Sequence, residues 1–292
     1  MIAKQFDPHG FRELRIDVWK ATVEIVNSGG YQLDGAEIKI NNDSIPGQTE
    51  FFKAPPKLQG SSAKHETKFS CIEADCLETA NVLRNAGLTP CVLNMASAHN
   101  PGGGVRNGAG AQEENIFRRT NLFRSLYQFA GYAVEYGVTA SKDRYPLDGK
   151  TGGVYSGGIT IFRASESSGY ALLKEPYQVS FASVPALNRP ELEKKGGRYF
   201  IADSLVETAR EKIRTILRIA AVHHHESLVL SAFGCGAFAN PPNHVALLFK
   251  EVFEEDEFKN RFRTVVFSII DDHNSRKEQN PEGNVLPFLK VF

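Results

Sequence analysis

Apolar residues recur along the chain at two spacings, one typical of helices and one typical of buried strands. Across residues 11–27 they lie near helical spacing, and the run ends at Gly29-Gly30, which predicts an amphipathic helix. Residues 90–95 form a short, nearly continuous apolar run, which predicts a strand buried on both faces.

The same two patterns predict the remaining elements. Strands are expected over residues 68–74, 158–162, 177–185, 228–233 and 264–270, and helices over 75–85, 113–128, 201–223 and 243–253. Residues 44–65 are rich in Pro, Gly, Gln and Ser and are expected to form a loop, and residues 138–158 a long connection. Strands that alternate with helices predict an α/β fold whose mostly parallel sheet is covered on both faces.

Composition excludes several classes of protein. Of the 292 residues 41% are apolar, enough to bury a core, and 34 Lys+Arg balance 34 Asp+Glu. Strong direct binding to nucleic acid is not expected, because it depends on a surplus of cations. No apolar run approaches the roughly 18 residues of a membrane span, and the four cysteines include no C-x-x-C pair. We therefore expect a soluble, cytoplasmic protein that binds no membrane.

Metal and cofactor sites are not indicated either. The run His223-His224-His225 could suggest a metal site, but consecutive histidines at the end of a predicted helix more often interact with its dipole. We expect no metal and no cofactor.

Two segments follow a predicted strand, contain several glycines and lead into a predicted helix. They are residues 100–110 and residues 234–238. Ligands of open α/β sheets bind beyond the carboxyl ends of the strands, glycines allow close approach of the backbone, and N–H groups at helix starts suit phosphate. Two such loops in one sheet suit a diphosphate-bridged nucleotide. A nicotinamide cofactor is disfavoured, because no acidic strand end follows Gly234-x-Gly236 at about 20 residues.

An unusual triplet, Gln112-Glu113-Glu114, begins the helix after the first loop and is separated from Gly104 by a seven-residue spacer. One explanation is an acidic first turn stabilised by the helix dipole. The other is catalytic. A phosphate and a carboxylate at one helix start repel each other, unless the carboxyl is protonated or faces another part of the ligand. A carboxyl that is protonated near neutral pH is what a general acid requires.

The segment from Asn100 to Gly104, its spacer and the triplet 112–114 resemble the GGG-x(6–8)-QEE signature of the poly(ADP-ribose) glycohydrolases. Residues 93–98, 118–122, 234–238 and 267–271 are also similar to the microbial-type members of that family. The resemblance implies a three-layer α/β/α macrodomain-like catalytic domain over residues 67–292, with a mixed, mostly parallel sheet. Residues 1–66 would be an N-terminal helical and loop extension packed on it.

The resemblance also implies an activity and a partner. The expected reaction is hydrolysis of the ribose–ribose O-glycosidic bonds of poly(ADP-ribose), with ADP-ribose as product. The expected partner is this polymer or another ADP-ribosylated macromolecule.

Residue roles follow from the same resemblance. Glu114 matches the catalytic Glu of the signature, and Glu113, counted with it as catalytic, holds ribose hydroxyls. In the expected site, Asn100 touches the ribose, the two loops hold the diphosphate and Phe238 lies near the scissile ribose. The implied substrate-binding residues are Asn100, Gly102, Gly103, Gly104, Gln112, Gly234, Cys235, Gly236, Ala237 and Phe238.

Neighbouring side chains on a helix diverge by about 100°, so Glu113 and Glu114 are poorly placed to flank one glycosidic bond. We therefore expect Glu114 to act alone as acid and then as base. Two alternatives stay open at this point. One is a hydrolase that removes a single ADP-ribose from a protein or nucleobase. The other is a non-catalytic ADP-ribose-binding macrodomain, which would not explain the triplet.

Overall fold

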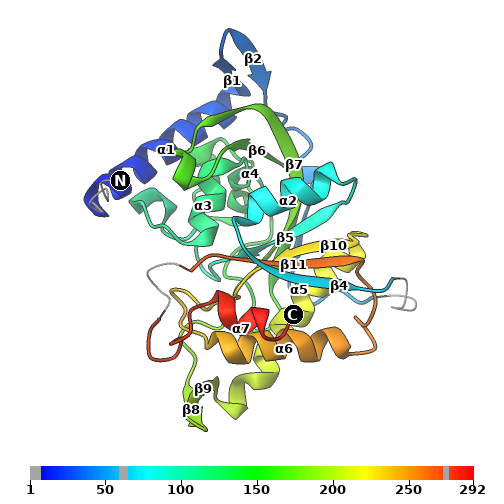
Figure 1. Ribbon diagram of the computed structural model, residues 1–292. Coiled ribbons are helices and arrows are strands. Elements are labelled where there is room, and N and C mark those ends of the chain that lie inside the picture. The colour runs from blue at the N-terminus through cyan, green and yellow to red at the C-terminus, as the bar shows by residue number, and fades with distance from the viewer. Residues whose placement is uncertain (1–7, 59–64, 272–275) are drawn as a thin grey trace.

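A mixed seven-stranded sheet forms the centre of the molecule in the computed structural model, which describes residues 8–58, 65–271 and 276–292 (Figure 1). Its order is β3-β6-β7-β5-β10-β11-β4. The strands are β3 (Thr49–Phe52), β4 (Lys68–Glu73), β5 (Pro90–Met95), β6 (Gly153–Arg163), β7 (Leu172–Val184), β10 (Ser227–Leu230) and β11 (Thr264–Ile269). From β7 to β4 all neighbours are parallel, and β6 and β3 are antiparallel at one edge. The predicted α/β fold with a mostly parallel sheet is confirmed.

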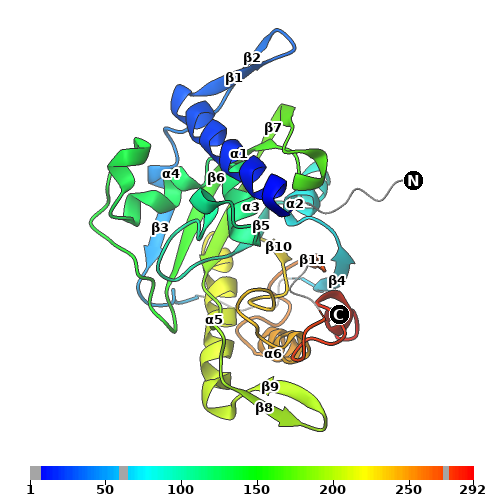
Figure 2. The same ribbon diagram turned by 90° about the vertical axis from the view of Figure 1, so that its left-hand side faces the viewer.

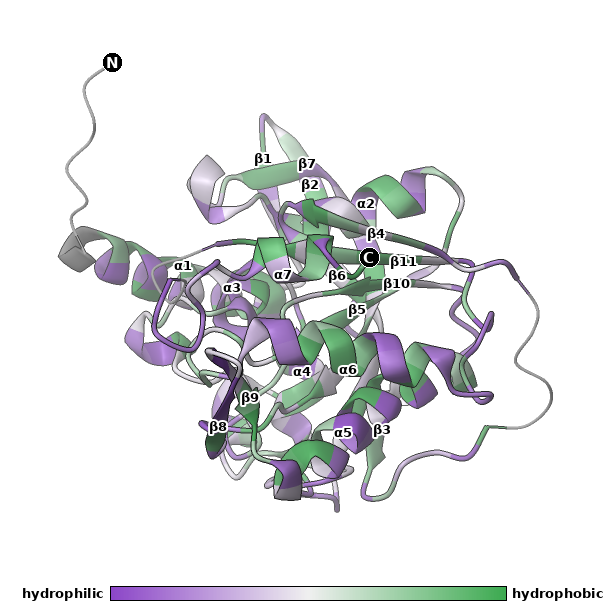
Figure 3. Ribbon diagram, turned by 60° about the horizontal axis from the view of Figure 1, so that its bottom comes forward, coloured by the Kyte–Doolittle hydropathy of each residue, from purple (hydrophilic) through white to green (hydrophobic). Residues whose placement is uncertain are grey.

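Helices cover both faces of this sheet and complete the three layers (Figures 1 and 2). One layer holds α1 (Pro8–Ser28), α2 (Cys76–Asn85), α3 (Gln112–Arg119) and α4 (Phe123–Leu126), and the other holds α5 (Asp203–Val222), α6 (Pro242–Glu254) and α7 (Val285–Leu289). On β5, Val92 packs into the first layer, whereas Cys91 and Leu93 pack into the second. This alternation explains why the strand is apolar at successive positions. The helices α5 and α6 differ from β5, because hydrophilic stretches alternate with hydrophobic ones along them (Figure 3).

Two hairpins that the sequence did not predict project from opposite ends of the molecule (Figure 2). They are β1 (Gly30–Leu33) with β2 (Ala36–Lys39), and β8 (Leu192–Lys195) with β9 (Arg198–Ile201). Each turns through two residues of positive φ, Asp34-Gly35 in the first and Gly196-Gly197 in the second, as two-residue hairpin loops require.

Three expectations about the elements were wrong. The single helix expected over 113–128 is broken at Thr120, whose backbone is extended and bridges to Ile161 on β6. The Thr120 hydroxyl donates to Ile116 O at 2.9 Å and accepts from Leu122 N at 3.1 Å, so the side chain satisfies backbone groups at the break. The loop expected over 44–65 contains β3, which pairs with β6, and the connection expected to reach residue 158 ends where β6 begins, at Gly153.

The N-terminal helix packs on the layer that carries the acidic triplet. Trp19 lies 6.1 Å from Phe117 between ring centroids, and Thr22 Oγ1 donates to Arg118 O at 2.6 Å. The division of the chain at residue 66 stays a prediction. Among the described residues, no helix combines the length and apolar character that crossing a bilayer requires.

Candidate active site

A cleft of about 660 Å³ opens at the carboxyl ends of the parallel strands. Glu73 of β4, Met95 of β5 and Ile269 of β11 contribute to its lining, as does Ser231 directly after β10. The carboxyl ends of parallel strands meet at one edge of a sheet, which is where ligands of such folds bind. The volume lies within the roughly 300–1,000 Å³ of small-molecule sites.

The first glycine loop lies against the acidic residues of α3. Gly102 and Gly103 have φ of +79° and +52°, a region that favours glycine. A Cβ at Gly102 would lie 2.6 Å from the Phe117 ring, and one at Gly103 would collide with Glu114 Oε1. Glycine at these positions therefore makes room for the carboxylate and for the aromatic ring beneath the loop.

One oxygen of Glu114 is held and the other is unpaired. The side chain is 7% exposed, and Oε1 accepts a hydrogen bond from Gly104 N at 2.9 Å. Oε2 is buried and accepts no hydrogen bond from any described residue. An unpaired buried oxygen is costly, so this atom is suited to a hydrogen-bonding ligand.

Glu113 is enclosed by hydrogen-bond donors. Its Oε2 accepts from Ser97 N at 2.8 Å and its Oε1 from Asn94 Nδ2 at 3.3 Å. Burial, and after it the neighbouring charge of Glu114, raise the pKa of Glu113 to about 8, although the backbone N–H groups of Ser97 and Gly102 oppose the rise. Glu113 is therefore harder to ionise than a carboxyl in water.

Gln112 joins the start of α3 to the end of β5. Its Oε1 accepts from Met95 N and its Nε2 donates to Leu93 O, both at 2.8 Å. The amide thus pairs with backbone groups of the last three residues of β5. This arrangement fixes the helix start, and with it the two acidic side chains that follow.

The second glycine loop is restrained from below by Asn240, which the sequence did not single out. Asn240 is 2% exposed, and its Nδ2 donates to Leu187 O at 2.7 Å, Gly234 O at 3.0 Å and Phe238 O at 3.3 Å. Gly234 has a φ of +76°, and a Cβ there would lie 2.6 Å from Asn240 Nδ2. One buried amide therefore sets the shape of the whole loop.

The backbone of this loop offers several free donors. Within the described chain, no acceptor is bound to the N–H groups of Gly236, Ala237 or Phe238. The N–H of Cys235 donates to Ala232 O at 3.0 Å, and its side chain is buried in the core. Three successive free N–H groups at a cleft suit an anion.

The predicted site residues divide into two groups. Gln112, Gly234, Gly236, Ala237 and Phe238 line the cleft. The other predicted residues are not among the described residues that line the cleft. They are Glu113 and Glu114, which lie next to the first glycine loop, and Asn100, Gly102, Gly103, Gly104 and Cys235.

The N-terminal helix supplies a wall of the cleft that no local sequence pattern predicts. Arg15 of α1 forms a bidentate ion pair with Glu166, Nε to Oε1 at 2.6 Å and Nη2 to Oε2 at 2.9 Å. Both residues line the cleft together with Phe11. The partners are 151 positions apart, so no local pattern signals the pair.

The histidine run lies away from this cleft. His225 Nε2 and the Tyr155 hydroxyl are hydrogen-bonded at 2.9 Å, and His225 Nδ1 lies 3.0 Å from Thr89 O, just before the amino end of β5. The His223 ring stacks on Tyr155 at 3.5 Å. In the described ranges no group of three or more potential metal ligands comes together.

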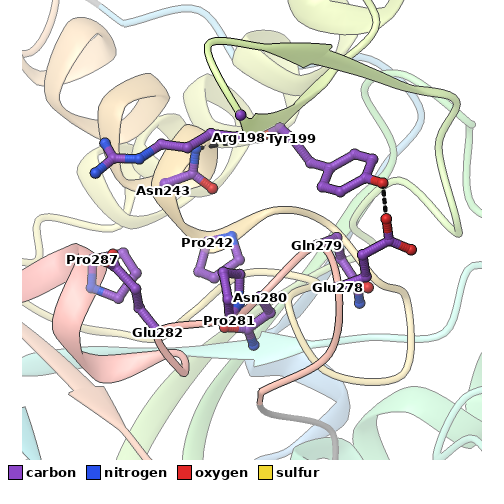
Figure 4. A pocket seen from close by; sticks show the side chains of 11 residues that line it. Arg198, Tyr199, Pro242, Asn243, Glu278, Gln279, Asn280, Pro281, Glu282 and Pro287 are labelled. Atoms are coloured by element: carbon purple, nitrogen blue, oxygen red, sulfur yellow. Dashed lines mark hydrogen bonds between the residues drawn. The ribbon is translucent and has the colours of Figure 1, made fainter.

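A second, smaller pocket of about 90 Å³ lies between the β8–β9 hairpin and the start of α6 (Figure 4). Tyr199 is hydrogen-bonded to Glu278 there, and Asn243 Nδ2 donates to Tyr199 O at 3.2 Å. Its volume is below that of usual small-molecule sites, so the larger cleft is the candidate for a nucleotide.

Comparison with known proteins gives one family and several solved structures. The family model described as microbial-type PARG, catalytic domain, matches residues 20–164. The crystal structure of poly(ADP-ribose) glycohydrolase from Thermomonospora curvata aligns with a TM-score of 0.78 and 29% identity, over 96% of this chain and 100% of that chain. The same enzyme bound to the inhibitor ADP-HPD aligns at 0.74 and 28%, with the same coverage.

A more distant solved structure is poly(ADP-ribose) glycohydrolase from Deinococcus radiodurans in complex with ADP-ribose. It aligns at a TM-score of 0.63 and 25% identity, over 89% of this chain and 98% of that chain. A search of curated proteins found no match.

Proposed function

We propose that this chain, a member of the microbial-type poly(ADP-ribose) glycohydrolase family, hydrolyses the ribose–ribose O-glycosidic bonds of poly(ADP-ribose) and releases ADP-ribose. The observation that carries the proposal is the state of Glu114. One of its oxygens is held by the glycine loop, and the other is buried and unpaired within the described chain. Solved enzymes of this name bind ADP-ribose or ADP-HPD, which supports the same substrate here.

The two glycine loops are proposed to bind different parts of the ligand. The diphosphate is placed on the free N–H groups of residues 236–238, and the Phe238 ring stacks on the sugar that carries the scissile bond. Asn100 and Glu113 are assigned to ribose hydroxyls. Gly102, Gly103 and Gly104 approach the ligand with their backbone while holding Glu114 in place. Gln112 acts by fixing the start of α3 and Cys235 by the position of its loop, because the amide of Gln112 and the N–H of Cys235 already have partners.

In the proposed reaction one residue acts first as acid and then as base. Glu114 protonates the leaving ribose oxygen as an oxocarbenium-like centre forms, and then accepts a proton from the attacking water. The anionic diphosphate stabilises the positive charge that develops on the sugar. The raised pKa of Glu113 disfavours a negative charge on this side chain beside the phosphates.

The cysteines and the net charge bear on the location and the partner of the protein. The four cysteines are free, which supports the cytoplasmic location that we propose. Net charge is zero, which disfavours tight, non-specific binding to nucleic acid; the proposed partner is the ADP-ribose polymer or another ADP-ribosylated macromolecule.

The deciding experiment compares three substrates: poly(ADP-ribose), a protein that carries single ADP-ribose groups, and DNA that carries them. The proposal predicts rapid release of ADP-ribose from the polymer and little from the other two. Faster release from a singly modified protein or nucleobase would assign a different hydrolase. Binding of ADP-ribose without any release would make the chain a reader of the modification.

A further inference from the structure

A cluster of aromatic side chains lies beneath the first glycine loop and joins it to three helices. Trp19 comes from α1, Phe117 from α3 and Phe123 from α4, and three tyrosines follow at positions 127, 132 and 136. Ring centroids lie 5.6 Å apart for Trp19 and Phe123, and 5.6 Å apart for Phe117 and Tyr127. We call these six residues the aromatic cluster.

Within the aromatic cluster, Tyr132 contacts both ends of the glycine loop. Its hydroxyl donates to Pro101 O at 3.3 Å, directly before the three glycines. Its ring lies 3.8 Å from the guanidinium carbon of Arg106, two positions after them. Tyr136 supports the same guanidinium at 4.8 Å, and Tyr127 packs edge-on against Tyr132 at 5.0 Å.

Between these two contacts the loop is held by its own backbone hydrogen bonds, among them Gly103 N to Asn100 O at 2.9 Å and Val105 N to Gly102 O at 3.0 Å. Three successive glycines restrict the backbone less than other residues would, so contacts at the ends of the loop add to these bonds in setting its path. The same loop holds Glu114, because Gly104 N donates to Glu114 Oε1 at 2.9 Å. A shift at either end of the loop would therefore move the donor that directs this carboxylate.

We propose that Tyr132 is a positioning residue for the hydrolysis: by fixing Pro101 and Arg106 it fixes the glycine loop, and through Gly104 the direction of Glu114. The inference rests on the proposed function. Tyr132 itself touches no reacting atom. It acts on the backbone whose geometry the reaction needs.

Two variants of Tyr132 separate its two contacts. Tyr132→Phe removes the hydrogen bond to Pro101 and keeps the stack on Arg106, and should lower kcat roughly threefold. Tyr132→Leu removes both contacts and should lower kcat by roughly 30-fold, since a misplacement of the order of 1 Å costs up to about 100-fold. KM for the polymer should change less than kcat in both. Arg106→Lys keeps the charge but not the planar stack, and its loss of kcat should lie between the losses in the two Tyr132 variants.

The matched control is Tyr31→Phe. The Tyr31 hydroxyl donates to Leu173 O on β7, so this variant also removes a tyrosine-to-carbonyl hydrogen bond, but far from the glycine loop. Its kcat should equal that of the wild type. Melting curves of all variants show whether a lost activity merely reflects unfolding.

Hydrogen exchange of the segment 101–110 gives a readout besides activity. Exchange should become faster in Tyr132→Leu and stay unchanged in Tyr31→Phe. A folded Tyr132→Leu with wild-type kcat, or one with unchanged exchange in this segment, overturns the inference. If the wild type itself releases no ADP-ribose in the same assay, the proposed function fails. If the wild type is active and the Tyr132 variants behave like it, only the inference about Tyr132 fails.

Discussion

Replacing Gly103 by alanine adds one methyl group at the close approach of the glycine loop to the carboxylate of Glu114, the proposed acid and base. The new Cβ would collide with Glu114 Oε1, whereas Glu113 Oε2, at 3.6 Å, is at ordinary contact distance. Restoring van der Waals distance requires the carboxylate or the loop to move by about 1 Å, and a misplacement of that size costs about 100-fold in rate. We therefore expect kcat on poly(ADP-ribose) to fall by about 100-fold in Gly103→Ala.

Backbone strain must be separated from this collision. Gly103 has a φ of +52°, and alanine in that region costs roughly 1–2 kcal/mol. Gly196, in the turn of the β8–β9 hairpin, has a φ of +57°, and a Cβ there would meet nothing within 4 Å. Gly196→Ala is thus a control with the same strain and no collision.

The assay measures kcat for release of ADP-ribose together with the free energy of unfolding. Both variants should lose similar stability, and Gly196→Ala alone should keep kcat within about twofold of the wild type. Near wild-type kcat in Gly103→Ala would show that the position of Glu114 does not depend on the space at residue 103. An equal loss in Gly196→Ala would show that strain alone causes the effect.

Two further predictions concern Glu113 and Phe238. The pKa of Glu113 is raised from 4.5 to about 8, so between these values the unfolded chain has lost a proton that the folded chain keeps. Stability therefore falls as pH rises through this window, by at most about 5 kcal/mol at 1.36 kcal/mol per unit. Urea unfolding at pH 5 and pH 8 should show a smaller fall in Glu113→Gln, and equal falls would contradict the burial of an ionising group there. Phe238→Ala should weaken ADP-ribose binding by roughly 1–3 kcal/mol if the ring stacks on the ligand. An unchanged isotherm in calorimetry would place Phe238 in the core only.

Where structure follows from local pattern, the sequence was sufficient. The apolar run over 90–95 became β5, and the helix expected over 75–85 is α2, which Asp75 caps by accepting from Leu77 N and Glu78 N. The joint position of the two glycine loops also followed, because both come after strands of one parallel sheet.

Long-range contacts explain what could not be predicted. The cleft wall formed by Arg15 and Glu166 and the restraint of the second loop by Asn240 depend on partners far apart in the chain or on the path of a loop. The break at Thr120 needed knowledge of Ile161, a strand residue to which it bridges. The space at Gly103 was expected to serve the ligand, and the structure adds a second reason, the carboxylate of Glu114.

Glu114→Gln tests the central claim most directly. The substitution keeps the size of the side chain, and its amide oxygen can still accept from Gly104 N, so fold and ligand site should persist. ADP-ribose affinity measured by calorimetry should stay within a few-fold, and turnover of poly(ADP-ribose) should fall by at least the roughly 100-fold assigned to general acid–base groups. A variant that releases ADP-ribose at near the wild-type rate would show that the glycosidic bond is broken without this carboxyl.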